Sequence, residues 1–108
     1  MYRKIFIVLM LVLFSPLCRA ESADQICTAG GYYSGAQDHF MSGLAMHILA
    51  QRNQLETPAC GALWKEALEV GERFSKTGKS RPSDARVITE AANFSRKVYD
   101  AVTKISAL

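Results

Sequence analysis

The sequence predicts an all-α protein: a small disulfide-stapled bundle of three helices, or four if the first is split, after a cleaved signal peptide. Three observations predict this class. Apolar residues recur at three-, four- and seven-residue spacings through most of the chain, which is the period of an amphipathic helix. No stretch alternates apolar and polar residues, and neither Asn-Gly nor Asp-Gly occurs to mark a β-hairpin. Two cysteines, Cys27 and Cys60, follow the signal segment.

Residues 1–20 have the pattern of a secretory signal peptide. A basic start precedes an unbroken apolar run at 5–14, and small residues at Cys18 and Ala20 permit cleavage after Ala20. The run is shorter than the roughly 20 residues that a helix needs to cross a bilayer, so no stable membrane insertion is expected after processing. We therefore expect export to the periplasm.

The remaining chain, residues 21–108, is expected to be a single helical domain with balanced charge. The signal segment holds three of the 13 basic residues and none of the 10 acidic ones, so ten of each sign remain. Phosphate binding needs a basic surplus or a basic face. Nucleic acid is therefore not expected as a partner.

Cys27 and Cys60 are predicted to pair, because an exported chain meets an oxidising environment. A domain of this size buries little surface and gains from a staple. The bridge would close a loop of about 33 residues and contribute roughly 3–4 kcal/mol through chain entropy. The alternatives are two buried free thiols or a bridge between two chains.

The first helix is predicted to begin at Ser22, in a capping box with Gln25, and to end after 52–53. An unbroken helix of that length would place Cys27 about 40 Å from Cys60 in a simple hairpin. A disulfide needs Cα atoms within about 7 Å. A steep helix crossing or a break resolves the conflict. We favour a break at Gly30-Gly31, because glycine costs about 1 kcal/mol in a helix interior.

Gly31, Gly35 and Gly43 would follow one line on this helix and leave a groove without side chains. Another backbone can approach such a groove closely. The groove predicts a tight helix crossing inside the bundle. The alternatives are a contact with a partner's loop and a homodimer contact.

The second helix is predicted to begin at Thr57, with Pro58 in its first turn, and to end at Gly78. Trp64 and Phe74 lie on its apolar face and are predicted to be core residues rather than a ligand cage. On the opposite face, Glu69 with Arg73 and Glu72 with Lys76 have the spacing of favourable ion pairs. A short basic loop at 79–82 follows, and Ser83 is predicted to cap a third helix that runs to the C-terminus.

Catalytic and metal-binding patterns are weak. His39 and His47 lie about 80° apart around a helix and no cysteine or carboxylate completes a metal set with them at a recognised spacing. Asp38-His39 beside Ser34 or Ser42 contains the residue types of a triad, but Gly-x-Ser-x-Gly is absent. No enzymatic activity, metal or cofactor is expected.

Cys27 followed by Gly31-Tyr32-Tyr33-x-Gly35-x-x-Asp38 resembles the first-helix motif of the Rap/Tai-type immunity proteins of type VI secretion. Pro58-Ala59-Cys60 resembles the family's second cysteine, which stands next to a proline at a helix start, and the alanine-rich stretch 84–91 resembles a later helix. The resemblance implies a non-catalytic periplasmic protein that binds and blocks a secreted cell-wall-degrading amidase. No inhibitory residue can be assigned from the motif.

The exposed loops 54–57 and 79–83 are the expected contact segments of such an inhibitor. A periplasmic chaperone or stress protein is the alternative, and it would expose apolar surface at low pH. A component of an envelope-assembly machine is a third interpretation.

Overall fold

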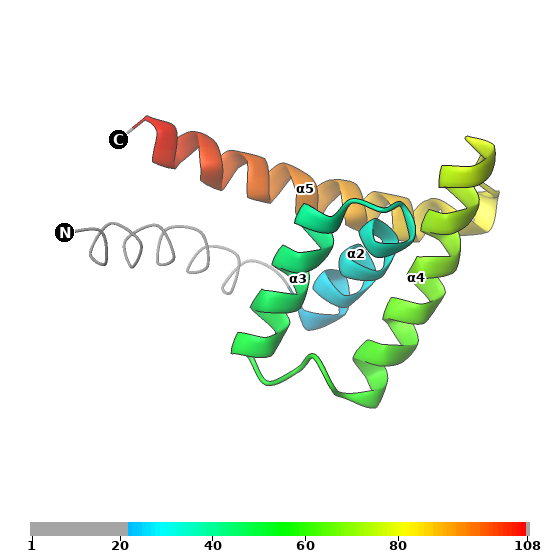
Figure 1. Ribbon diagram of the computed structural model, residues 1–108, viewed down its shortest axis with the longest axis horizontal. Coiled ribbons are helices and arrows are strands. Elements are labelled where there is room, and N and C mark those ends of the chain that lie inside the picture. Colours follow the sequence, from blue (N-terminus) through cyan, green and yellow to red (C-terminus); the bar gives the residue numbers. More distant parts are fainter. Residues whose placement is uncertain (1–21, 108) are drawn as a thin grey trace.

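The computed structural model describes residues 22–107, which form four α-helices and one short 3-10 helix (Figure 1). In chain order these are α2 (Ala23–Gly35), α3 (His39–Gln51), α4 (Pro58–Thr77), η1 (Pro82–Asp84) and α5 (Ala85–Ser106). No strand occurs in this part of the chain, so the predicted all-α fold class is confirmed. The predicted signal peptide, residues 1–20, and its cleavage site lie outside the described residues.

The central element is α2, against which α3, α4 and α5 each pack. Figure 1 shows α2 between α3 and α4, with α5 running across them. Six consecutive residues of α2, 26–31, are buried. A helix surrounded on all sides has no solvent face to keep polar, which explains why this stretch is apolar or small throughout.

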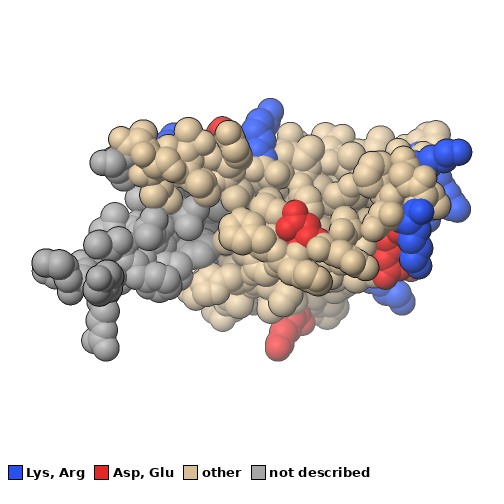
Figure 2. All heavy atoms as spheres, turned by 45° about the horizontal axis from the view of Figure 1, so that its top comes forward, with Lys and Arg blue, Asp and Glu red and all other residues tan. Residues whose placement is uncertain are grey.

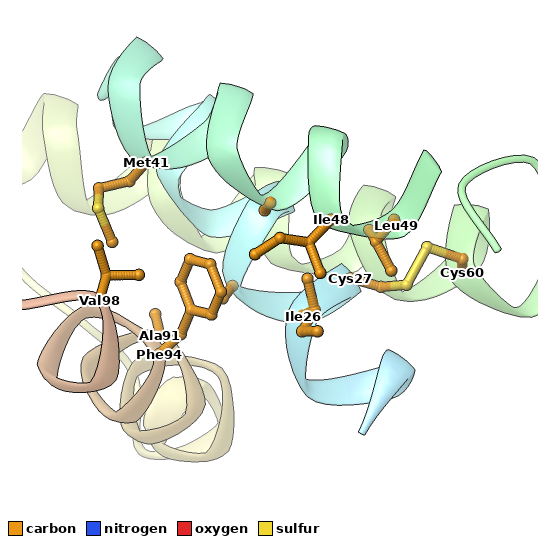
Figure 3. Packing of buried hydrophobic residues seen from close by; sticks show 11 residues of the cluster. Ile26, Cys27, Met41, Ile48, Leu49, Cys60, Ala91, Phe94 and Val98 are labelled. Carbon is orange, nitrogen blue, oxygen red and sulfur yellow. A yellow bond between two sulfur atoms is a disulfide. The ribbon is translucent and has the colours of Figure 1, made fainter. Parts of the chain in front are cut away.

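The main hydrophobic core joins α2, α3 and α5 (Figure 3). Phe94 of α5 is fully buried and points toward Ile48 of α3, while Met41 and Val98 meet beside it. A smaller cluster of Ala67, Val70 and Val87 joins α4 to α5.

The helix boundaries largely follow local signals in the sequence. Ser22 caps α2 by accepting a hydrogen bond from the Gln25 amide at 3.2 Å. Thr57 caps α4 in the same way through the Cys60 amide at 3.2 Å. Gly78 ends α4 with a φ of 67°, the left-handed conformation that glycine adopts without strain. These three predictions are confirmed.

The predicted break at Gly30-Gly31 is wrong. α2 continues through both glycines to Gly35, and the chain turns at 36–38 instead, where Gln37 has a φ of 64°. α3 then runs back along α2, so it ends near the start of α2 (Figure 1). α4 begins at that same end of the bundle. This reversal removes the conflict between helix length and the disulfide.

The start of α5 also differs from the prediction. A 3-10 turn, Pro82–Asp84, precedes the helix, and Ser83 lies inside that turn rather than at a cap.

None of the helices between residues 22 and 107 combines the length and the apolar character that a membrane span requires.

Candidate functional site

The disulfide Cys27–Cys60 joins the second turn of α2 to the first turn of α4, with a Cα–Cα distance of 5.3 Å. Both cysteines are buried within the main core (Figure 3). The predicted pairing within one chain is therefore confirmed. The bridge indicates an oxidising compartment, since disulfides persist there and are rare in the cytosol.

The glycines of α2 form a close crossing with α4. A methyl group at Gly31 would overlap the backbone carbonyl of Trp64, and one at Gly35 would overlap that of Leu68. From the other side, a methyl group at Gly71 would overlap the carbonyl of Tyr32. The groove predicted on α2 is thus filled by α4 of the same chain. Gly71, the glycine that α4 contributes, was not assigned this role from the sequence.

Gly43 has a different position from the one predicted. It lies on α3, beyond the turn at 36–38, and open space surrounds the place where its side chain would be. The expectation that it continues the line of Gly31 and Gly35 is wrong, because the three residues do not belong to one helix.

The two tyrosines of the motif pack across helix contacts. The Tyr33 hydroxyl donates a hydrogen bond to the Ala91 carbonyl of α5 at 2.8 Å. Its ring meets that of Tyr32 edge-on, with centroids 5.3 Å apart. Burial raises the pKa of both phenols above the ordinary value. Tyr32 contacts both hydrophobic clusters, so the pair connects α2 to its neighbours.

Asp38 is the N-cap of α3. Its Oδ1 accepts a hydrogen bond from the Met41 amide at 3.1 Å. Its carboxylate therefore has a local structural role at the turn that reverses the chain. The residues of the motif lie at the contacts of α2 with its neighbours and at its C-terminal turn; they are Cys27, Gly31, Tyr32, Tyr33, Gly35 and Asp38. Asp38 is exposed at this turn, and the two tyrosines are half-buried.

The two histidines, His39 and His47, are both exposed on α3. Among residues 22–107, no three His, Cys, Asp or Glu side chains lie close enough to hold a metal ion.

The first of the two predicted contact loops follows α3. Asn53 has a φ of 57°, and the Gln54 amide donates to the Leu49 carbonyl at 2.9 Å, which turns the chain toward α4. A shallow surface pocket of about 320 Å³ opens here, lined by Ala50, Asn53, Leu55 and Glu56.

The second predicted contact loop, 79–83, follows the end of α4 and runs into η1, and every residue from 74 to 83 is exposed. Phe74 is 40% exposed there, so its predicted place in the core is wrong, whereas Trp64 does pack against the core.

The ion pair of Arg73 also differs from the prediction. It forms an ion pair with Asp84 at 2.9 Å rather than with Glu69.

Asp84 holds this loop in place. Its Oδ2 accepts a hydrogen bond from the Arg81 amide at 3.0 Å, while Oδ1 faces Arg73. The bond from the Arg81 amide, together with the guanidinium of Arg73, holds the pKa of Asp84 below its ordinary value, against the opposing effect of burial. Asp84 directly follows Ser83, the residue predicted to cap the third helix, and nothing in the sequence pointed to its partner on α4.

Comparison of the chain with protein-family models, with curated proteins and with solved structures finds no match. The fold and the disulfide define the class of molecule: a small disulfide-linked bundle of α-helices.

Proposed function

We propose that this chain is a non-catalytic periplasmic binding protein, and specifically an immunity protein that binds and blocks a cell-wall-degrading amidase toxin. The proposal joins the signal-peptide pattern of 1–20, the disulfide of an oxidising compartment and the resemblance to Rap/Tai-type proteins.

One observation carries the proposal. The two separate segments of the resemblance that carry cysteines meet in the fold, because Cys27 is bonded to Cys60 and the glycines of the motif lie against the backbone of α4. This contact supports an architecture in which the motif builds the bundle and the loops 54–57 and 79–83 meet the toxin.

A rescue assay tests this proposal. The product of the adjacent gene is directed to the periplasm of a host, with and without this protein, and lysis is followed by turbidity. We expect lysis with the toxin alone and protection when the full chain is present. A variant lacking 1–20 is the control, because a protein retained in the cytoplasm should not protect.

Two outcomes would contradict the proposal. The neighbouring product could be harmless in the periplasm, or cells could lyse equally with and without the full chain. Protection by the variant lacking 1–20 would contradict the periplasmic location while leaving an inhibitory role.

A periplasmic chaperone is the second candidate, and the exposed aromatic residues favour it. Phe40 and Tyr99 are 71% and 72% exposed, which is uncommon for large apolar side chains. A chaperone of this kind should expose further apolar surface at low pH. A sharp acid-induced rise in the fluorescence of a hydrophobic dye, with helicity retained, would support it. A flat dye signal down to acid unfolding would exclude it.

A further inference from the structure

The end of the molecule formed by α4, η1 and their connection is rich in positive charge. Residues 73–86 contain five cationic side chains and one carboxylate, Asp84, whereas the rest of the described chain carries five cationic residues and eight carboxylates. Figure 2 shows Lys and Arg side chains gathered at this end of the molecule. The cationic residues are Arg73, Lys76, Lys79, Arg81 and Arg86.

Two of these five residues form ion pairs. Arg73 pairs with Asp84, and Arg86 pairs with Glu66 at 3.1 Å and Glu90 at 3.5 Å. Lys76, Lys79 and Arg81 are exposed and form no ion pair with any described residue. These three residues, with the backbone of 76–81, are called the cationic turn below.

The cationic turn is held rigid by hydrogen bonds. The Thr77 hydroxyl donates to the Arg73 carbonyl at 2.7 Å and accepts from the Lys79 amide at 3.1 Å. The Arg81 amide is fixed by Asp84, which Arg73 ties to α4. Because these hydrogen bonds already order the backbone of the turn, binding has only its exposed side chains to order.

We propose that the cationic turn is the docking surface for a carboxylate-rich surface of a protein partner. Opposite charge steers such a partner and orients it. Phe74, 40% exposed on the last turns of α4, offers an aromatic side chain of the type enriched at interface centres. This docking proposal rests on the proposed immunity function, because the cationic turn would be the surface that contacts the toxin.

A protein fits this surface better than an anionic membrane. Segments that bind anionic lipid headgroups commonly hold clusters of about four to eight basic residues, and the cationic turn has three. Carboxylates flank it, since Glu72 lies on the neighbouring turn of α4 and Glu66 and Glu90 pair with Arg86. A continuous anionic lipid surface would also place negative charge against these carboxylates, whereas a polypeptide can place its own carboxylates between them.

Binding of fluorescent poly-L-glutamate, followed by anisotropy at low and high salt, tests the site directly. We compare Lys79→Glu/Arg81→Glu with Lys65→Glu/Lys104→Glu, which changes net charge equally on α4 and α5 away from the turn. We expect salt-sensitive binding by the wild type, at least a tenfold loss in the first variant, and less than a threefold change in the second. Lys79→Gln/Arg81→Gln should give a smaller loss with less perturbation of the fold.

Equal losses in the two charge-reversal variants would overturn the proposal, because net charge rather than the turn would then govern binding. Binding to phosphatidylglycerol vesicles without binding to poly-L-glutamate would overturn it in favour of a membrane surface. Absence of binding to either probe at low salt would also overturn it.

The rescue assay separates this proposal from the proposed function. If the wild type protects and Lys79→Glu/Arg81→Glu does not, while the Lys65/Lys104 control still protects, both proposals are supported. If all three protect equally, the docking site is wrong and the immunity function stands. If the wild type does not protect, the proposed function fails, and the poly-L-glutamate experiment alone decides whether the turn binds acidic protein.

Discussion

Glycine at three positions allows α2 and α4 to touch along their backbones. Gly31 and Gly35 of α2 face the carbonyls of Trp64 and Leu68, and Gly71 of α4 faces that of Tyr32. Any side chain there meets backbone, which cannot rotate away as the end of a side chain can. Each glycine lowers helix stability by about 1 kcal/mol, and the close packing of the two helices offsets this cost.

Alanine substitution should separate this packing role from simple helix propensity. Gly31→Ala should lower the free energy of unfolding by about 1–3 kcal/mol, because overpacking outweighs the gain in helix propensity. Gly43→Ala is the matched control, since open space surrounds that site within a helix. It should raise stability by up to about 1 kcal/mol. Urea unfolding followed by circular dichroism measures both, and equal effects of the same sign would contradict the prediction.

At the scale of elements, η1 is fastened to α4 by a single carboxylate. Asp84 is buried, and its two oxygens receive the Arg81 amide and the Arg73 guanidinium. One residue thus closes the connection between α4 and α5 and shapes the exposed turn between them. The exposed Arg86 pairs add little to this, because ion pairs in water typically contribute less than about 1 kcal/mol.

Stability should depend on pH through Asp84. Its folded pKa lies below the value of about 3.9 expected in an unfolded chain. The ionised carboxylate therefore favours the folded state fully above that value, and this contribution is lost as the pH falls through the lowered folded pKa. Asp84→Asn should be less stable than wild type at neutral pH, and the difference should shrink in acid.

Urea midpoints at neutral pH and in acid measure this difference. Asp100→Asn, an exposed site on α5, is the control and should leave the pH dependence close to that of wild type. A constant gap between Asp84→Asn and wild type across the pH range would show that the pKa of Asp84 is not lowered by folding.

For the whole molecule, α2 is the element that unites the bundle. Each of the other three helices packs mainly against it, and the disulfide fastens its first turns to α4. Loss of α2 contacts would therefore affect every helix. The main effect of this covalent bond is on the unfolded chain, whose conformational freedom it restricts.

Removal of the disulfide should lower the free energy of unfolding of the whole domain. Cys27→Ala/Cys60→Ala releases a closed loop with a sequence separation of 33, and the chain-entropy model gives a loss of about 3–4 kcal/mol. That is a large share of the roughly 5–15 kcal/mol by which single domains are stable. Urea unfolding should show the lower stability together with a steeper denaturant dependence, because the unfolded chain becomes more expanded. An unchanged midpoint would contradict this.

Some features of the candidate site follow from neighbouring residues, and others depend on residues far away in the sequence. The exposed connection at 79–83 was predicted from Gly78, which ends the preceding helix, and from the basic residues and proline that follow it; these signals act within a few residues. Its rigidity was not predictable, because Arg73 had a closer partner in sequence at Glu69. Burial of Asp84 against α4 decided which carboxylate Arg73 meets.

The sequence by itself determined the all-α class, the starts at Ser22 and Thr57, the end at Gly78 and the pairing of the two cysteines. Caps and apolar periodicity act within about one helical turn, so they can be read without knowing the fold. The tertiary structure alone decided where the first helical region breaks. Gly30 and Gly31 weaken a helix locally, but contact with Trp64, more than thirty residues away, keeps α2 continuous there, and the chain turns at 36–38.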